Sequence, residues 1–164
     1  MAETQTAVYP GVFDPVTLGH VDVIRRGAAL FGGLVVGVHA HPAAKQCLFS
    51  VEERVDLLRQ ATAQVGGVTV VPYDGLTVDF VREQGASAML RGLRQHGDFA
   101  QEHDMALTNR AVGGVETVFM MADPQTAFIS SHLVREVARL GGDVSGLVPD
   151  GVAQALARKR TENG

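Results

Sequence analysis

The sequence predicts an α/β fold built around a doubly wound, five-stranded parallel sheet, with further helices toward the C-terminal end. Short apolar runs alternate along the chain with segments of helical periodicity, which is the order expected of repeated β-α units. The runs are continuously apolar instead of alternating between apolar and polar residues, and that pattern is typical of parallel strands buried on both faces. Together these observations favour a parallel sheet covered by helices.

Five short runs rich in aliphatic and β-branched residues are the expected strands. They occupy residues 6–9, 34–39, 68–72, 88–90 and 117–121. In a doubly wound sheet, ligands bind beyond the carboxyl ends of the strands, where the strand order reverses. We expect the first and fourth strands to be neighbours at that point, so the segments that follow them are candidates for a binding site.

Helical patterns follow the first three runs. Apolar residues recur at the spacing of one helical face in the first pattern, at Val21, Ile24, Ala28 and Phe31. Ser50 and Glu53 form a capping box that predicts the start of the second helix. The third helix is expected to stop at Gly85, since glycine commonly follows the last helical turn.

Three further helices are expected in the C-terminal half. Asp98 is expected to cap the fourth helix, and Ser130 or Ser131 the fifth. The last helix is expected to follow Pro149. The apolar residues of the fourth and fifth helices are Met105, Ala106 and Val112, and Leu133, Val134, Val137 and Leu140. In the last helix, Val152, Leu156 and Ala157 are expected to face inward.

Length and composition indicate a globular protein. The 164 residues are expected to form one domain, structured from about residue 6 to residue 160. Hydrophobic residues make up 46% and charged residues 20%, which is too apolar for a disordered chain. The formal net charge of −4 offers no basic field to recruit nucleic acid or an anionic membrane. An anionic substrate must therefore be captured by a few cations and backbone amides.

The sequence also predicts a cellular location. Its apolar runs are far shorter than the roughly 20 residues that a membrane span needs. Residues 1–6 are polar and lack the apolar stretch of a signal peptide. The single Cys47 excludes a disulfide within the chain and, without a signal, favours a reducing compartment. We therefore expect a cytoplasmic protein with neither a membrane nor a nucleic-acid partner.

The segment after the first strand is suited to binding phosphate. Gly11 lets the backbone approach a ligand closely, and Pro15 stiffens the turn. Gly19 and His20 open a helix whose N-terminal amides and dipole favour an anion, to which His20 can donate a hydrogen bond. The alternative is a simple turn with an exposed histidine at a helix start.

Cations follow the second and fourth strands. Arg91 and Arg94 bracket Gly92, and two guanidinium groups at a strand end can clamp phosphate oxygens. The alternative is that both arginines are solvated surface charges. Lys45 can reach the same crevice from the end of the second strand, or it can be an ordinary loop lysine. Glu102 lies near the start of the next helix, where an acidic residue often compensates the helix dipole.

Two hydroxyls precede the fifth helix. Ser130 and Ser131 can bind a polyphosphate at the helix start, although capping the backbone is the commoner use of serine there.

Other motif classes find no support. The sequence has no GxxxxGK[ST] or GxGxxG after a strand, and no HExxH or CxxC.

These motifs resemble the two signatures of the nucleotidyltransferase superfamily, in the same order. Thr17-Leu18-Gly19-His20 resembles the (H/T)xGH signature, and Ile129-Ser130-Ser131 with Arg135 resembles the second signature. From residue 8 to about residue 157 the chain resembles the bacterial phosphopantetheine adenylyltransferase family. Further matching positions include Gly11, Phe13, Asp14 and Pro15, Phe49, Glu52, Glu53 and Arg54, Asp98 and Phe99, Asn109 and Arg110, and Gly142 and Asp143.

The resemblance implies a Rossmann-like nucleotidyltransferase fold and an activity in coenzyme A biosynthesis. It implies transfer of the adenylyl group of ATP to 4′-phosphopantetheine, giving dephospho-coenzyme A and pyrophosphate. It further implies Mg²⁺ bound mainly through the ATP phosphates, a homohexamer, and coenzyme A as a candidate feedback ligand.

The resemblance also assigns roles to residues. His20 would contact the α-phosphate, and Lys45 and Arg91 would hold the acceptor phosphate and the transferring group. Thr77 would touch the pantetheine arm through its backbone. Val12 would contact both nucleotide and acceptor. The other nucleotide contacts would be Phe13, Gly92, Leu93, Arg94, Glu102, Thr126, Ala127, Phe128, Ile129, Ser130, Ser131 and His132.

Three positions depart from the family pattern. Val12 stands where the family usually has a threonine or serine whose hydroxyl contacts substrate phosphate. Gln101 replaces a usual tyrosine, and His132 replaces a third serine or threonine. We expect weaker acceptor binding without loss of chemistry. Two alternatives stay open: transfer to another acceptor, such as nicotinamide mononucleotide or glycerol phosphate, and a non-catalytic nucleotide-binding homologue.

Overall fold

A five-stranded parallel sheet forms the centre of the computed structural model, which describes residues 5–42 and 46–162. The strand order is β3-β2-β1-β4-β5. All five predicted strands are present, each longer than predicted by one to three residues. They are β1 (Thr6–Gly11), β2 (Gly33–His39), β3 (Val68–Tyr73), β4 (Ala88–Leu93) and β5 (Glu116–Met121).

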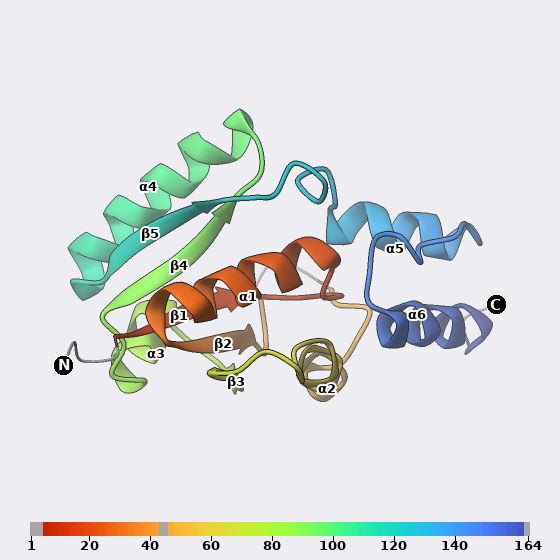
Figure 1. The fold of residues 1–164 in the computed structure, drawn as a ribbon, viewed down its shortest axis with the longest axis horizontal. Coiled ribbons are helices and arrows are strands. Elements are labelled where there is room, and N and C mark those ends of the chain that lie inside the picture. Colours follow the sequence, from red (N-terminus) through yellow and green to blue (C-terminus); the bar gives the residue numbers. More distant parts are fainter. Residues whose placement is uncertain (1–4, 43–45, 163–164) are drawn as a thin grey trace.

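Helices cover both faces of this sheet, as the sequence predicts (Figure 1). α1 (Leu18–Phe31) and α2 (Val51–Ala61) pack on one face, and α3 (Thr77–Glu83) and α4 (His96–Gly113) on the other. α5 (Ser131–Arg139) and α6 (Asp150–Glu162) pack together beyond the carboxyl ends of the strands. Within the described residues, no helix has both the length and the apolar character to cross a membrane.

The strand order reverses between β1 and β4. β1 pairs with β2 along its whole length on one side, and with β4 through Ala7 and Val8 on the other. The chain returns to β1 only after it has built β2 and β3. The segments that leave β1 and β4 therefore start side by side, at the position predicted for a ligand.

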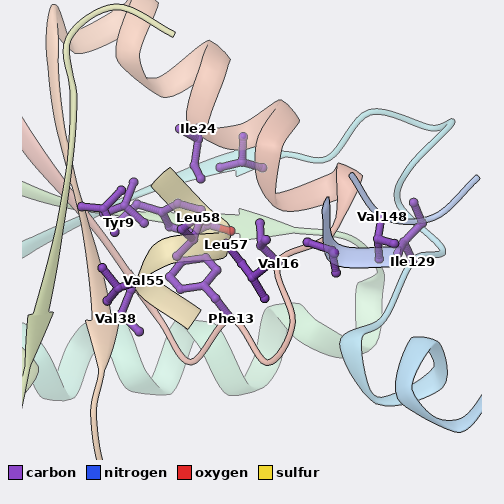
Figure 2. Close-up of a cluster of buried hydrophobic side chains, with 14 of the residues drawn as sticks. Tyr9, Phe13, Val16, Ile24, Val38, Val55, Leu57, Leu58, Ile129 and Val148 are labelled. Atoms are coloured by element: carbon purple, nitrogen blue, oxygen red, sulfur yellow. The ribbon is translucent and has the colours of Figure 1, made fainter. Parts of the chain in front are cut away.

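Two hydrophobic clusters hold the helices against the sheet, one on each face. Tyr9 belongs to the larger cluster, beside Ile24 of α1 and Leu58 of α2 (Figure 2). Val8 belongs to the smaller cluster, beside Val81 of α3. Successive side chains of a strand point to opposite faces, so one strand supplies both cores.

The two edge strands are less buried than the sequence predicts. β1, β2 and β4 are largely buried, but Glu116, Val118 and Met121 of β5 are exposed. The prediction of burial on both faces is therefore wrong for β5, and β3 is also partly exposed. A strand at the sheet edge has a neighbour on one side only, so apolar composition alone does not measure its burial.

The ends and faces of three helices also differ from prediction. α4 begins at His96 with Gln95 at its N-cap position, so Asp98 lies in the first turn and does not cap the helix. Ser130 occupies the N-cap position of α5, but within the described chain its hydroxyl makes no capping hydrogen bond. On α6, Ala157 is exposed and Ala155 is buried instead, because the inward face follows Val152 and Leu156 at helical spacing.

Gly27 sets the distance between α1 and the sheet. A β-carbon at this position would lie 2.5 Å from Cδ2 of Leu90 and 3.3 Å from Cδ2 of Leu34. We expect Gly27→Ala to lower the free energy of unfolding by about 1–3 kcal/mol, because overpacking a filled core strains its side chains. Denaturant unfolding measures this change.

Gly97→Ala in α4 is the matched control. Apart from its chain neighbours and the nearby backbone of its own helix, no described atom lies within 4 Å of a β-carbon built at Gly97. This substitution should leave stability unchanged or raise it by up to about 1 kcal/mol, since alanine favours helix. Equal losses of stability in both variants would contradict the packing described for α1.

Candidate active site

A cleft of about 690 Å³ opens at the carboxyl ends of β1 and β4. Its walls come from five parts of the chain: β1 with the loop and first turns of α1 that follow it, Gln46 before α2, the end of β4, the first turns of α4, and the segment after β5 with the first turns of α5. These parts are far apart in sequence and meet where the strand order reverses. The cleft therefore lies where the fold class predicts it.

Most of the predicted site residues line this cleft. They are Val12, Phe13, His20, Arg91, Gly92, Arg94, Glu102, Thr126, Ile129, Ser130, Ser131 and His132. Gln101, singled out as a departure from the family pattern, lines it as well.

Four predicted residues that the structure describes do not line the cleft. Leu93, Ala127 and Phe128 belong to the same segments but do not line the cleft, and Phe128 is largely exposed. Thr77 begins α3, where its hydroxyl lies 2.9 Å from the hydroxyl of Tyr73. Lys45 falls outside the described residues.

The β1–α1 loop has a tightly fitted turn at Phe13. Phe13 has a φ of 51°, which is rare for a bulky residue, and its ring is buried. The ring packs edge-on against Tyr9 and His20, with centroid distances of 5.4 Å and 5.0 Å. A β-carbon at Gly11 would lie 2.9 Å from the same ring, so this turn requires glycine at position 11.

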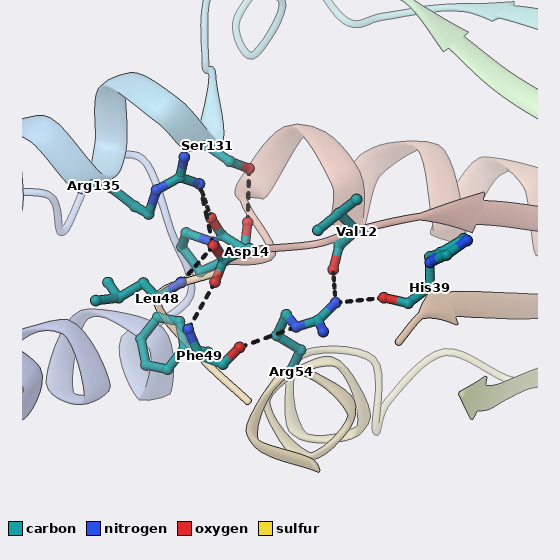
Figure 3. Close-up of polar contacts among 9 residues, drawn as sticks. Val12, Asp14, His39, Leu48, Phe49, Arg54, Ser131 and Arg135 are labelled. Atoms are coloured by element: carbon teal, nitrogen blue, oxygen red, sulfur yellow. Dashed lines mark hydrogen bonds and ion pairs between the residues drawn. The ribbon is translucent and has the colours of Figure 1, made fainter. Parts of the chain in front are cut away.

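Two buried charged side chains hold this loop in place (Figure 3). The carboxylate of Asp14 accepts hydrogen bonds from the backbone N–H groups of Leu48 and Phe49, at 2.8 Å and 3.0 Å. The guanidinium group of Arg54 donates to the carbonyl of Val12 at 2.8 Å. Asp14 thus binds the loop to the chain before α2, and Arg54 binds it to α2 itself.

Arg54 also joins the loop to the end of β2. It donates to the carbonyls of His39 and Ala40 at 2.8 Å and 2.9 Å, and to the carbonyl of Phe49 at 3.2 Å. Every guanidinium nitrogen therefore has at least one carbonyl partner. A buried cation is tolerated only when its donors are satisfied in this way.

α5 is fixed to the same loop by two of its residues. The hydroxyl of Ser131 donates to the carbonyl of Pro15 at 2.8 Å. Arg135 donates to the carbonyl of Asp14 and lies 3.5 Å from Asp14 Oδ2 (Figure 3). The second signature is therefore bonded to the loop that leads into the first one, and the N-terminus of α5 borders the cleft.

His20 lies one turn into α1 and takes part in the helix cap. The backbone N–H of Thr17 donates to His20 Nδ1 at 3.0 Å, while the backbone N–H of His20 donates to Thr17 Oγ1 at 3.3 Å. Burial, together with the charges of Arg94 and Arg91, lowers the pKa of His20 to about 4. The ring is therefore neutral at physiological pH.

Three hydrogen bonds hold the guanidinium group of Arg91 in the wall of the cleft. Its Nε and Nη2 donate to the two carboxylate oxygens of Glu102 at 2.9 Å and 2.5 Å, and its Nη1 donates to the carbonyl of Pro10 at 2.9 Å. Burial alone would lower the pKa of Arg91, but the hydrogen bonds and charge of Glu102 raise it. Arg91 therefore stays charged, and Glu102 supports Arg91 in addition to bordering the cleft.

Arg94 connects β4 to the second signature. Its Nη1 donates to the carbonyl of Ile129 at 3.0 Å, and its Nε lies 3.5 Å from Asp98 Oδ2. Asp98 thus pairs with a cleft arginine from the first turn of α4. The sequence predicts the arginines but not their carboxylate partners, because pairing across elements leaves no local spacing pattern.

Sequence reasoning missed the supporting residues of the site. The sequence indicates Arg54 only as part of a string that matches the family pattern, since an arginine in an amphipathic helix usually lies on a solvated face. It predicts Tyr9 only as part of a strand, yet Tyr9 lines the cleft, and burial raises its pKa to about 12. The position of Arg54 one turn after the Ser50 capping box was the available signal.

The arrangement suits a polyanionic ligand. Backbone amides at the start of α5, neutral His20, and the guanidinium groups of Arg91 and Arg94 border one cleft. Each of these arginines also lies against a carboxylate, so the cleft is less positive than its arginines alone suggest. Among the described residues, no group of three metal-ligating side chains could hold an ion.

Comparison with known proteins agrees with this geometry. The cytidylyltransferase-like family matches residues 8–137, which include both signatures. A protein of Caldanaerobacter subterraneus named phosphopantetheine adenylyltransferase is 47% identical over 94% of this chain and 97% of its own length. Proteins of the same name from Desulforudis audaxviator and Corynebacterium glutamicum are 51% and 46% identical, each over 93% of this chain and over 94% and 96% of their own lengths.

The lowered pKa of His20 makes stability depend on pH. The unfolded chain binds this proton more readily than the folded one, since the pKa rises from about 4 to its ordinary 6.5 on unfolding. The His20 contribution should be constant above about pH 7 and destabilise the fold by roughly 2–3 kcal/mol as the pH falls from 6.5 to 4. Unfolding experiments across this range measure it.

His20→Gln is the comparison variant, because glutamine does not titrate and can accept the same capping hydrogen bond. We expect the wild-type protein to lose more stability than this variant between pH 7 and pH 4. Parallel stability profiles of the two proteins would contradict a buried, neutral ring.

Proposed function

The chain belongs to the phosphopantetheine adenylyltransferase family of cytidylyltransferase-like proteins, and on that basis we propose that it transfers AMP from ATP to 4′-phosphopantetheine. The products are dephospho-coenzyme A and pyrophosphate. The observation that carries the proposal is that His20, Arg91 and Ser131, which come from three separate segments, line the same cleft. Identities of 46–51% over more than nine-tenths of the chain support the acceptor.

The reaction needs alignment of two anions more than it needs a nucleophile from the protein. A phosphate oxygen of the acceptor forms a bond to the α-phosphorus of ATP. The bond from that phosphorus to the oxygen that bridges the α- and β-phosphates breaks, and pyrophosphate leaves. The acceptor phosphate is already ionised, so no covalent enzyme intermediate is required. Positioning and preorganised charge are the main effects in such transfers.

The cleft residues divide these tasks. His20 donates a hydrogen bond to the α-phosphate, where negative charge develops. Arg91, fixed by Glu102, holds the acceptor phosphate, and we propose that Lys45 assists it. The amides and hydroxyls at the start of α5 receive the β- and γ-phosphates. Gly92 and Arg94 border the adenosine.

We propose that Mg²⁺ is carried on the triphosphate. Magnesium commonly binds substrate phosphates and keeps several waters instead of occupying a cage of side chains. The absence of a three-ligand cluster among the described residues fits this mode. When Mg²⁺ is bound, it would neutralise part of the negative charge of the triphosphate.

We also propose a homo-oligomer, with a hexamer as the expectation from the family resemblance. β5 is an edge strand, and its outer surface and that of α4 expose large apolar side chains, which commonly mark protein interfaces. They are Phe99, Met105, Leu107, Val112 and Met121. Coenzyme A as a feedback ligand rests on the resemblance alone.

Pyrophosphate release tests the proposed function directly. With ATP and Mg²⁺, release should depend on 4′-phosphopantetheine and should be absent with nicotinamide mononucleotide, glycerol phosphate or no acceptor. His20→Ala should lower kcat by about 10²–10³-fold with little loss of folded protein, since it removes a donor to the transition state. Circular dichroism confirms that the variant is folded.

The alternatives give different results in the same assay. Release with another phosphate acceptor alone would replace the acceptor in the proposal. ATP binding without release for any acceptor would indicate a non-catalytic nucleotide-binding protein. Full turnover by His20→Ala would remove His20 from the mechanism.

Val12 is the position at which acceptor affinity should be improvable. Val12 lines the cleft, and its carbonyl is held by Arg54, so a threonine side chain would occupy the same place. Val12→Thr should lower the KM for 4′-phosphopantetheine about three- to tenfold through one added hydrogen bond to the phosphate. Steady-state kinetics with saturating ATP measure it.

Val12→Ala is the matched control, because it changes the side chain without supplying a hydroxyl. Its acceptor KM should stay at or above the wild-type value. An unchanged KM in Val12→Thr would contradict the assignment of Val12 to the acceptor phosphate.

A further inference from the structure

The capping box of α1 differs from the usual one in the residue at its third helical position. A capping box normally uses glutamate or glutamine there to accept a hydrogen bond from the backbone N–H of the N-cap residue. Here His20 takes that place, and its Nδ1 is the acceptor, 3.0 Å from the backbone nitrogen of Thr17. The residue expected to act on substrate is therefore also part of the helix cap.

Two contacts of His20 Nδ1, one with the backbone N–H of Thr17 and one with its hydroxyl, together decide where the imidazole proton resides. A backbone N–H can only donate, so the Nδ1 that faces it must present a lone pair. Thr17 Oγ1 lies 3.2 Å from the same Nδ1 and accepts from the backbone N–H of His20, which leaves the hydroxyl proton available for Nδ1. Both contacts favour the tautomer with its proton on Nε2.

The surroundings hold the ring in this state. Phe13 packs edge-on against the imidazole at 5.0 Å with an interplanar angle of 76°. Thr17 is buried, with 2% of its surface exposed. The charges of Arg94, just after β4, and of Arg91 in β4 oppose a positive charge on the ring. The carboxylates of Asp98 and Glu102 in α4 are engaged with these two arginines.

We propose that Thr17 is a positioning residue that locks His20 as the neutral Nε2–H tautomer, so that His20 presents a permanent hydrogen-bond donor to the cleft. The two nitrogens of an imidazole ring point in different directions, so Nε2 of His20 faces away from the backbone N–H of Thr17 that contacts Nδ1. His20 itself lines the cleft. His20 then acts as a fixed donor and takes no proton during the reaction. This inference deepens the proposed function and rests on it.

The tautomer can be measured without any substrate. Long-range ¹H–¹⁵N spectra of the imidazole rings distinguish a protonated from an unprotonated nitrogen, and His20→Gln assigns the His20 signals among the six histidines. We expect an unprotonated Nδ1 and a protonated Nε2 across the neutral pH range. A protonated Nδ1 in the wild-type protein would overturn the proposal, whatever the activity assays show.

Two substitutions at Thr17 test the link to turnover. Thr17→Val removes the hydroxyl and keeps the shape of the side chain. It should lower kcat about tenfold, because one supporting hydrogen bond is lost. It should change the KM for ATP little. The Nδ1–H form or the charged form of His20 should then become detectable. Thr17→Ser keeps the hydroxyl and should restore both kcat and the tautomer.

Ser50→Ala controls for loss of a helix cap alone. Ser50 and Glu53 form the corresponding capping box of α2, so this variant should lose about as much stability as Thr17→Val. It should retain the His20 tautomer and wild-type kcat.

Thr17→Val with an unchanged tautomer and unchanged kcat would overturn the role of Thr17, and so would an equal kcat loss in Ser50→Ala. If the protein turns over no acceptor, the proposed function fails, and the spectra still decide the tautomer.

Discussion

The site depends on one loop, residues 11–17, being held in a single conformation between β1 and α1. Asp14 and Arg54 do this from inside the protein, each with hydrogen bonds to backbone groups of neighbouring segments. Removing one partner of a buried charge is costly, at about 3–5 kcal/mol, because the other charged or polar groups lose their partners. The loop is therefore determined by the ends of β1 and β2 and the start of α2 together.

Other parts of the cleft are built onto this loop. Arg135 and Ser131 attach α5 to it, and Arg91 reaches from β4 to the carbonyl of Pro10 just before it. Arg94 then joins the end of β4 to Ile129. The hydrogen-bond donors proposed for the α-phosphate and for the terminal phosphates thus share one support, so we expect their relative positions to stay the same when a ligand binds.

Much of the fold and of the cleft could be predicted from the sequence, for reasons that particular elements make clear. The apolar runs and the Ser50 capping box are local patterns, and the structure confirms the five strands and the start of α2. The expectation that His20 and Arg91 border one cleft follows from topology, since the doubly wound strand order places β1 next to β4. Recognition of the family added the site residues that no local pattern indicates.

What the sequence could not predict depends on contacts between distant segments. Asp98 was expected to cap α4, but a cap is decided by the backbone of the residue before the first turn, and that residue is Gln95. The exposure of β5 follows from its place at the sheet edge, which composition does not record. The buried role of Arg54 depends on the carbonyls of Val12, His39 and Ala40 in two other segments, so its sequence neighbours do not show which groups it contacts.

A crystal structure of the protein with a non-hydrolysable ATP analogue tests the central claim most directly, namely that the loop is organised before the nucleotide binds. The account predicts that residues 11–17 keep their backbone conformation, with Asp14 still bonded to Leu48 and Phe49. It also predicts the α-phosphate within hydrogen-bond distance of His20 Nε2 and the terminal phosphates at the start of α5. A loop that breaks the Asp14 contacts to admit the nucleotide, or a nucleotide bound outside this cleft, would contradict it.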